Sequence, residues 1–292
     1  MEIAIFGKSF GEVFYDNCRQ LFDHLLHQNT RVFIYKPFYD FLLRKVKIKP
    51  EVAGYFSNPE ELPSVDMLFS IGGDGTFLEA VTYVRDSGIP IVGINSGRLG
   101  FLADISRHEL PVALEEIENG HYRVKELSLL ELSTPEHLTG DFGFALNELA
   151  IHKRDSSSMI TIHAYLNNEF LNSYWADGLI VSTPTGSTAY SLSVGGPIMH
   201  PSSQGIIITP IAPHNLTVRP LVVPDHMELT LKVEGRGGNF LTSLDSRSMV
   251  VNEDTELRIR KAGFSIHMVE RQSQSFYATL RNKLMWGADK RN

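Results

Sequence analysis

The chain has 292 residues, of which 42% are hydrophobic, 10% aromatic and 21% charged. This is the composition of a globular protein of about two domains, which excludes disordered, collagen-like and coiled-coil chains. The 27 Lys and Arg residues are outnumbered by 34 Asp and Glu residues, the formal net charge is -7, and the basic residues form no stripe, so we expect no nucleic-acid partner.

Cysteine content and the lengths of the apolar runs indicate the cellular compartment. Cys18 is the only cysteine, so the chain has no disulfide framework and no Cys-based zinc site, as is usual in a reducing compartment. The first residues carry no basic leader with a cleavable apolar segment, and the longest apolar stretches, such as residues 206–208, are far shorter than a membrane span. We expect a cytoplasmic protein with no membrane partner.

The first part of the chain alternates short apolar runs with segments of helical period. The pattern predicts strands at 3–6, 31–35, 65–71 and 89–94, and helices at 13–25, 76–85 and 106–120. In the last helix, Ser106 and Glu109 have the spacing of a capping box, and Gly120 suits the helix end. Such alternation implies a parallel sheet covered by helices, so we predict a Rossmann-like α/β domain over residues 1–122.

After residue 122 the hydrophobic period changes to two. Apolar and polar residues alternate over 160–166, 229–233 and 257–260, with turn signals between these runs. We therefore predict a mostly antiparallel, β-sandwich-like domain over residues 123–270. The final segment, residues 271–292, has helical spacing over 275–286, and we expect this helix to dock back on one of the cores.

The run Gly72-Gly73-Asp74-Gly75-Thr76 lies directly after a predicted strand and before a predicted helix. The glycines allow the backbone close to a phosphate, and the helix start directs free amides toward it. A carboxylate would repel a phosphate, so Asp74 suits the handling of a hydroxyl proton or a bound metal. The alternative is a tight turn in which Asp74 or Thr76 caps the helix.

Two further glycine patterns are weaker signals. Gly7-Lys8-Ser9 resembles the end of a P-loop, but Glu2 stands where the first glycine is required. Gly93, Gly97 and Gly100 lack the spacing of the Rossmann dinucleotide fingerprint.

Residues 183–191 are rich in small hydroxyl side chains beside Tyr190. This segment could offer polar groups and a stacking face to a nucleotide base, or it could be a β-loop with Tyr190 as a core aromatic. For Asn147 and Glu148 taken alone, an outward-facing polar pair in a strand is the simpler interpretation, and a lone His214 is more often structural than catalytic.

Together these motifs closely resemble those of one family, the NAD kinases, which use ATP to phosphorylate the 2′-hydroxyl of the adenosine ribose of NAD. The matching runs are GGDGT at 72–76, GINSGRLGFL at 93–102, LNE at 146–148, DGLIVSTPTGSTAYSLS at 177–193, GGP at 195–197 and PIAPH at 210–214. The first run is shared with lipid kinases, whereas 177–193 is specific. The resemblance implies an N-terminal α/β domain, a C-terminal β domain, and a homo-oligomer, either a dimer or a tetramer.

Carried over position by position, the resemblance implies a role for each matching residue. Asp74 would accept the ribose proton, and Gly75 would lie against the ligand. Asn147 and Glu148 would hold the adenosine ribose, and Asp177 would reach the nicotinamide end. The remaining implied nucleotide contacts are Thr188, Ala189, Tyr190, Ser191, Leu192 and Ser193 around the adenine, and Ala212 and Arg247 from a neighbouring subunit.

The sequence departs from the family pattern at two positions. Glu79 replaces a basic residue, which puts a phosphate contact from that helix in doubt, and Arg247 replaces a Gln and could supply a positive group. Mg²⁺ or another divalent metal would arrive with ATP, because the spacings show no all-protein metal cage. Two alternatives to an NAD kinase remain: a lipid kinase that shares the Gly-Gly-Asp-Gly loop, and a non-catalytic dinucleotide-binding module.

Overall fold

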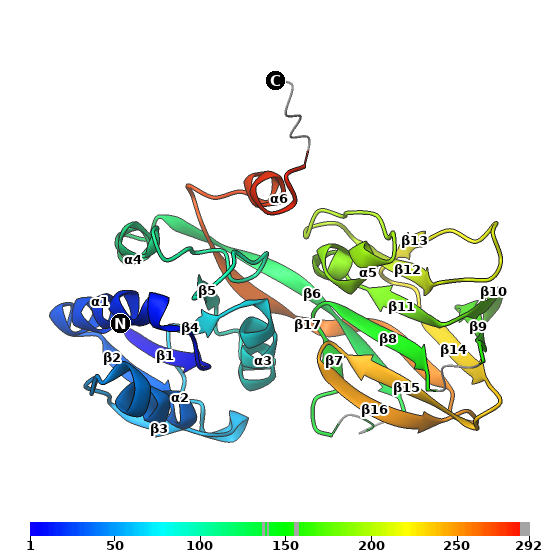
Figure 1. Cartoon of the computed structure of the whole chain (residues 1–292), viewed down its shortest axis with the longest axis horizontal. Coiled ribbons are helices and arrows are strands. Elements are labelled where there is room, and N and C mark those ends of the chain that lie inside the picture. Colours follow the sequence, from blue (N-terminus) through cyan, green and yellow to red (C-terminus); the bar gives the residue numbers. More distant parts are fainter. Residues whose placement is uncertain (136–137, 139, 155–157, 287–292) are drawn as a thin grey trace. The chain divides into compact units, whose positions relative to one another are not determined.

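The computed structural model divides into two compact units (Figure 1). It describes residues 1–135, 138, 140–154 and 158–286. Met1–Glu126 and Ile266–Asn292 form the first, which we call the α/β unit, and Leu127–Ser265 form the second, the β unit. Strands β6 and β17 carry the chain from one unit to the other. The division into folding domains at 1–122, 123–270 and 271–292 stays a prediction.

A parallel sheet forms the centre of the α/β unit, as predicted. Its strand order is β17-β5-β4-β1-β2-β3, and the pairs from β5 to β3 are all parallel. The strands are β1 (Glu2–Gly7), β2 (Arg31–Tyr35), β3 (Gly54–Phe56), β4 (Met67–Gly72), β5 (Ile91–Asn95) and the end of β17 (Leu257–Arg271). Two members of this sheet were not predicted: the three-residue β3, because so short a segment has no readable period, and the end of β17, which joins the sheet from a strand expected only in the second domain.

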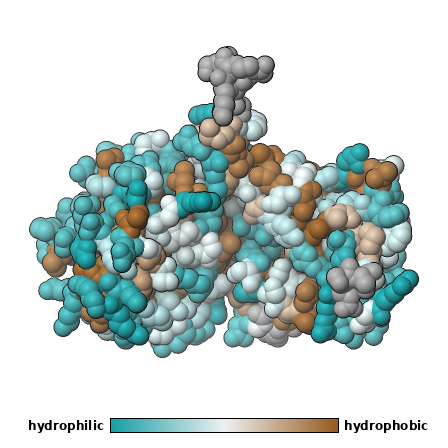
Figure 2. All heavy atoms as spheres, viewed as in Figure 1, coloured by the Kyte–Doolittle hydropathy of each residue, from teal (hydrophilic) through white to brown (hydrophobic). Residues whose placement is uncertain are grey.

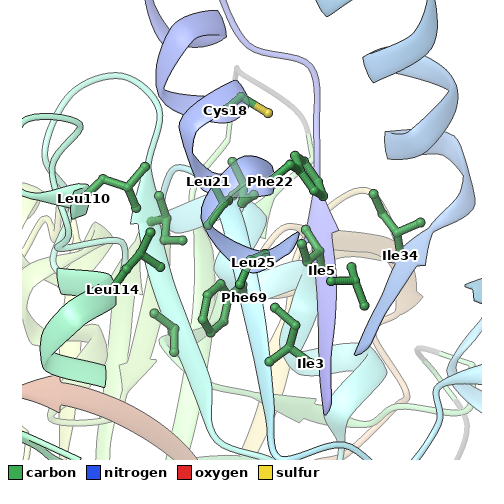
Figure 3. Close-up of a cluster of buried hydrophobic side chains, with 14 of the residues drawn as sticks. Ile3, Ile5, Cys18, Leu21, Phe22, Leu25, Ile34, Phe69, Leu110 and Leu114 are labelled. Atoms are coloured by element: carbon green, nitrogen blue, oxygen red, sulfur yellow. The ribbon is translucent and has the colours of Figure 1, made fainter. Parts of the chain in front are cut away.

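Helices cover both faces of this sheet. They are α1 (Tyr15–His27), α2 (Lys36–Phe41), α3 (Asp74–Val84) and α4 (Leu110–Glu118), with short helical turns at Glu12–Phe14, Leu42–Val46 and Pro59–Glu61. The last helix, α6 (Phe276–Leu284), instead contacts the loop after β5, where the ring centroids of Phe276 and Phe101 lie 6.4 Å apart. In Figure 3, α1 and α4 direct apolar side chains onto β1 and β4, where Leu21 and Phe69 belong to one buried cluster. Successive side chains of a strand point to opposite faces, so Phe6 instead contacts Tyr83 of α3.

The predicted capping box of α4 forms only in part, which corrects the expectation from the sequence. The Glu109 carboxylate accepts from the backbone nitrogen of Ser106 at 3.2 Å and from its Oγ at 2.5 Å. The hydroxyl is therefore used by the carboxylate and caps no helix amide, and Glu109 itself stands at the N-cap. Gly120, with φ of +70°, follows the helix end as predicted.

The β unit is a sandwich of antiparallel strands, which confirms the predicted architecture. One sheet has the order β13-β12-β11-β8-β15-β16, and the other runs β10-β9-β14-β17, with β6 beside β17 and β7 beside β6. The strands are β6 (Tyr122–Thr134), β7 (Phe144–Ala145), β8 (Glu148–Lys153), β9 (Ile160–Leu166), β10 (Glu169–Ala176), β11 (Gly178–Ser182), β12 (Gly205–Ile211), β13 (Leu221–Pro224), β14 (Leu229–Glu234), β15 (Asn239–Leu244), β16 (Arg247–Asn252) and β17. Side chains from both sheets, such as Ile162 and Val181, share one buried core.

The surface is that of a globular chain. The face in Figure 2 is mostly hydrophilic or intermediate, with hydrophobic residues in scattered groups. Within the part of the chain that the structure describes, every helix is too short or too polar to cross a membrane.

Candidate active site

The Gly-Gly-Asp-Gly run joins β4 to α3 in the α/β unit. Gly72 ends the strand, Gly73 is the N-cap of α3, and Asp74 is its first residue. A Cβ atom at Gly72 would lie 2.1 Å from Thr76 Oγ1, so the turn requires glycine there. At Gly73 and Gly75 a Cβ atom would meet nothing within 4 Å. The backbone at the start of α3 is therefore open to a ligand, and helix starts favour anions.

The Asp74 carboxylate anchors the loop that follows β5. Its Oδ2 accepts from the backbone nitrogen of Phe101 at 2.9 Å, and its Oδ1 accepts from Leu102 at 3.0 Å and Ala103 at 2.9 Å. A Cβ atom at Gly100 would lie 1.9 Å from Oδ1, so that glycine leaves room for the carboxylate. Asp74 makes no capping hydrogen bond, so the alternative that it caps α3 is wrong.

Glu79, the acidic departure on α3, pairs with a lysine from the end of β1. The Lys8 ammonium and the Glu79 carboxylate form an ion pair, and the backbone nitrogen of Lys8 donates to the Ile71 carbonyl at 3.4 Å. The negative charge of Glu79 is thus balanced inside the α/β unit. The pair gives Gly7-Lys8-Ser9 a role other than a phosphate loop.

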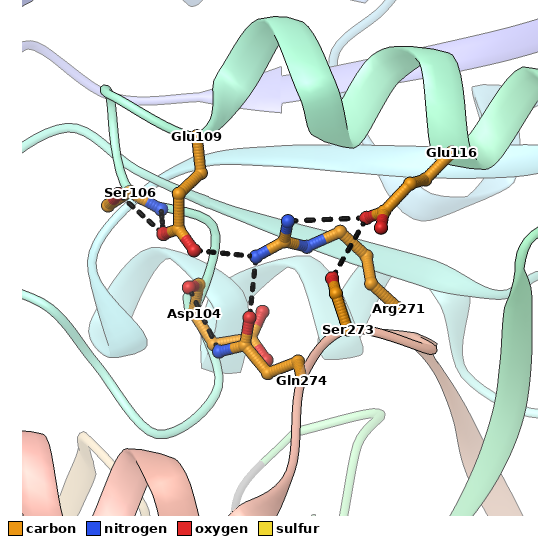
Figure 4. Close-up of polar contacts among 7 residues, drawn as sticks. All are labelled: Asp104, Ser106, Glu109, Glu116, Arg271, Ser273 and Gln274. Atoms are coloured by element: carbon orange, nitrogen blue, oxygen red, sulfur yellow. Dashed lines mark hydrogen bonds and ion pairs between the residues drawn. The ribbon is translucent and has the colours of Figure 1, made fainter.

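An ionic network ties the end of β17 to α4 and to the loop after β5 (Figure 4). Arg271, only 4% exposed, donates to Glu109 at 3.1 Å and to Glu116 at 3.3 Å. It also donates to Gln274, whose Nε2 donates to the Asp104 carbonyl at 3.3 Å. Burial raises the pKa of the Asp104 carboxyl to about 7, against the lowering effect of Arg271. The network supports the chain directly after the amides that hold Asp74.

In the β unit, Asp245 holds the start of β8 in the way that Asp74 holds its loop. Its carboxylate accepts from the backbone nitrogens of Leu146 at 2.9 Å, Asn147 at 2.8 Å and Glu148 at 3.2 Å. Asp245 stands in the turn between β15 and β16 with φ of +51°, and its own nitrogen donates to the Glu148 carbonyl at 2.9 Å. Burial raises the pKa of Asp245, and the three backbone hydrogen bonds oppose this shift.

Asn147 and Glu148 are buried, so the interpretation of them as an outward-facing polar pair is wrong. Their exposed fractions are 8% and 9%. Burial, together with the negative charge of Asp245, raises the pKa of Glu148 to about 7, while a hydrogen bond from the Tyr190 backbone lowers it. Glu148 Oε2 has no hydrogen-bond partner among the described residues. A buried acceptor of this kind is suited to a ligand hydroxyl.

The segment after β11 folds into a short 3₁₀ turn (Thr185–Thr188) and the short helix α5 (Tyr190–Ser193). Tyr190 is 37% exposed and stacks on His152, with ring centroids 5.6 Å apart and an interplanar angle of 18°. It is therefore not a core aromatic. Burial lowers the pKa of His152.

The other predicted contacts of this segment differ in accessibility. Ser191 is fully buried, and its hydroxyl hydrogen-bonds to Thr209 at 3.0 Å. Ser193 is exposed. Thr188, Ala189 and Leu192 are partly exposed.

The last three predicted residues lie at other places in the β unit. Asp177 precedes β11 and pairs with Lys153 at 2.6 Å. Ala212 is exposed, with φ of +44°. The Arg247 guanidinium donates to backbone carbonyls of Phe142 and Phe144, so part of its hydrogen-bonding capacity is used within its own chain.

Sequence patterns missed three functional candidates: Asp245, the Arg271 network and Lys283 of α6. Lys283 Nζ lies 3.4 Å from Asp74 Oδ2. Each acts on a residue far away in the sequence, so no local spacing marks it. For the Arg271 network, one local feature could have been noticed: Glu109 and Glu116 are seven positions apart and therefore lie on one face of α4.

Comparisons with known proteins agree on one family. Residues 19–122 match the ATP-NAD kinase N-terminal domain, and residues 146–271 match the ATP-NAD kinase C-terminal domain. An NAD kinase of Cytophaga hutchinsonii is 48% identical over 292 residues, and one of Flavobacterium johnsoniae is 47% identical over 294 residues; each alignment covers 100% of both chains.

Solved structures agree on the fold. An NAD kinase from Archaeoglobus fulgidus in complex with ATP has a TM-score of 0.76 and 26% identity, covering 98% of this chain and 99% of that one. Yeast NADH kinase complexed with NADH has a TM-score of 0.85 at 23% identity, covering 99% and 89%. The full-length relatives favour neither the lipid kinase nor the non-catalytic module. With both domains matched and near-half identity over the whole chain, the protein belongs to the ATP-NAD kinase family.

Proposed function

We propose that this NAD kinase transfers the γ-phosphoryl group of ATP to the 2′-hydroxyl of the adenosine ribose of NAD, with Asp74 as the proton acceptor. The observation that carries the proposal is the placement of the Asp74 carboxylate. Three backbone amides fix it at the open start of α3, next to Gly73 and Gly75. A fixed carboxylate beside free helix amides combines a base with an anion-binding backbone.

The proposed reaction is a direct transfer between the two substrates, and the protein mainly positions them. A bond forms between the ribose oxygen and the γ-phosphorus, the bond to the bridging oxygen breaks, and its electron pair leaves with ADP. The ribose proton passes to Asp74. A positioned base contributes roughly 10² to 10⁴ in rate, and alignment and electrostatics supply most of the rest.

The β unit supplies the proposed nucleotide contacts. Glu148 offers a buried oxygen that has no hydrogen-bond partner in the described part of the chain, and Tyr190 offers a partly exposed ring that stacks on His152. These features support ribose binding by Asn147 and Glu148 and adenine stacking by Tyr190. The buried, hydrogen-bonded hydroxyl of Ser191 supports a role in holding α5 rather than direct contact.

A divalent cation is proposed to arrive with ATP. Among the described residues no group of three or more His, Cys, Asp or Glu side chains is placed to hold a metal, so the donor set fits a cation carried mainly by phosphate oxygens. Mg²⁺ bound to ATP would neutralise charge on the β- and γ-phosphates. A cytoplasmic location and a dimeric or tetrameric assembly, in which Ala212 and Arg247 approach a neighbouring copy's ligand, also remain proposals.

The test is to incubate the purified protein with ATP, Mg²⁺ and NAD and to measure NADP with an NADP-specific dehydrogenase. We expect NADP from NAD and none from 2′-deoxyadenosine NAD, which lacks the acceptor hydroxyl. Phosphorylation of diacylglycerol without NADP formation would favour the lipid kinase. Binding of NAD without any product would favour the non-catalytic module.

A further inference from the structure

The C-terminal helix α6 brings a cation to the Asp74 carboxylate. Lys283 Nζ lies 3.4 Å from Asp74 Oδ2 and 4.5 Å from the centroid of the Phe101 ring. The helix is held at this place by Leu280, which is 2% exposed, and by Phe276, whose ring centroid lies 6.4 Å from that of Phe101. Ser275 caps its first turn by accepting from Ala278 at 3.2 Å. Lys283 thus reaches Asp74 from an anchored element.

The hydrogen bonds of Asp74 leave little room for another donor. An ionised carboxylate has about four acceptor sites, two on each oxygen. Leu102 and Ala103 donate to Oδ1, Phe101 donates to Oδ2, and Lys283 lies nearest the remaining site on Oδ2. A hydroxyl that gives its proton to Asp74 must therefore approach Oδ2 and share or replace the Lys283 contact.

With a substrate hydroxyl at Oδ2, the same geometry would bring Lys283 near the reacting phosphorus. A hydroxyl oxygen that donates to Oδ2 lies about 2.6 to 3.2 Å from it, and the γ-phosphorus bonds to that oxygen. The Lys283 ammonium lies 3.4 Å from Oδ2, and its long, flexible side chain is 30% exposed, so phosphoryl oxygens at that place would be within its reach.

We propose that Lys283 is a further catalytic residue, which leaves Asp74 for the γ-phosphoryl group when the substrates bind. This inference rests on the proposed function. The phosphoryl oxygens carry more negative charge than a carboxylate that already accepts hydrogen bonds from three amides, so they compete well for the ammonium. The exchange frees the Oδ2 acceptor site for the ribose proton and places positive charge beside the group being transferred. Lys283 keeps its own protons, because the ribose proton goes to Asp74.

The test compares Lys283→Met with Lys283→Arg, and uses Arg281→Met as a matched control. Arg281 is exposed on the same helix, so its variant removes the same charge. For Lys283→Met we expect kcat to fall roughly 10²- to 10³-fold, as when one donor to a transition-state charge is removed, with the KM values for NAD and ATP changed by less than about threefold. Lys283→Arg should recover part of this loss, and Arg281→Met should stay within about twofold of wild type.

Three kinetic results for the variants would overturn the proposal. One is a kcat for Lys283→Met within about twofold of wild type, another is an equal loss in Arg281→Met, and the third is a raised KM at unchanged kcat, which would assign Lys283 to substrate binding alone. Melting temperatures and hydrogen exchange at residues 101–103 should match wild type in Lys283→Met, and a collapse of either would assign it a purely structural role. NADP formation by the wild type in the same assay separates the two claims: an active wild type with an unimpaired variant overturns only this inference, and an inactive wild type overturns both.

Discussion

Asp74 Oδ2 accepts a hydrogen bond from the backbone nitrogen of Phe101 at 2.9 Å, so the proposed proton acceptor is also the anchor of a loop. Two further amides, of Leu102 and Ala103, bind its other oxygen. A substitution at Asp74 therefore has two consequences, one for chemistry and one for the loop. Experiments on this residue need a way to separate them.

Asp74→Asn should lower kcat by roughly 10²- to 10⁴-fold while NAD still binds, because an amide cannot take the ribose proton. Asn has one acceptor oxygen in place of two, so at least one loop amide loses its partner, and the free energy of unfolding should fall by about 1 to 3 kcal/mol. Steady-state kinetics and urea unfolding of the purified variant measure the two effects. Near-normal turnover at saturating NAD, ATP and Mg²⁺ would contradict the role of Asp74 as base.

Asp245→Asn provides the matched control, because Asp245 also accepts from three successive backbone amides. The free energy of unfolding of Asp245→Asn should likewise fall by about 1 to 3 kcal/mol. Since its partners include Asn147 and Glu148, the KM for NAD should rise, whereas kcat should fall far less than in Asp74→Asn. If both variants lost kcat equally, loop anchoring alone would explain the effect at Asp74.

Local patterns predicted most of the fold. The strand at Arg31–Tyr35 is found at the predicted residues, and the predicted strand at 65–71 and helix at 76–85 correspond to β4 and α3. Each of these elements carries its own hydrophobic period, so the information lies within a few residues. The Gly-Gly-Asp-Gly loop was recognisable for the same reason.

The details of the site depend on contacts between distant residues. Phe101 is 27 positions from Asp74, Asn147 is 98 from Asp245, and Lys283 is 209 from Asp74. No local spacing encodes such pairs. The capping box at Ser106 forms only in part, and the alternative of a cap by Asp74 is wrong, for a related reason: both residues have the right chemistry for a cap, but each side chain has other partners.

Tyr190→Ala should raise the KM for NAD more than it lowers kcat. Loss of base stacking worth about 1 to 3 kcal/mol corresponds to a change of about 5- to 150-fold. Tyr190→Phe keeps the ring and should remain near wild type. Tyr55→Ala removes another half-exposed tyrosine, in the α/β unit, and serves as the control. Unchanged NAD affinity with a large drop in melting temperature would mean that Tyr190 acts only in packing against His152.

The pH dependence of stability should carry a component from Glu148. Its pKa is raised from 4.5 to about 7 in the folded protein, so between these values the folded state holds a proton that the unfolded state releases. The stabilisation is therefore complete below about pH 4.5 and is lost as the pH rises through 7. A shift of this size corresponds to roughly 3 kcal/mol of unfolding free energy.

Glu148→Gln should remove this component, so the decline in unfolding free energy between pH 5 and about pH 7.5 should be smaller in the variant than in wild type. Glu169→Gln changes an exposed glutamate of β10 and should keep the wild-type profile. The pKa of Asp104 is also raised to about 7, so Asp104→Asn should likewise make the decline in unfolding free energy with pH smaller than in wild type. Because Glu148 and Asp104 belong to different compact units and share no hydrogen-bond partner among the described contacts, the effects of Glu148→Gln and Asp104→Asn should add. Urea unfolding of both single variants and the double variant across this pH range measures the sum, and a profile as steep as wild type in Glu148→Gln would show that Glu148 is ionised in the folded protein throughout.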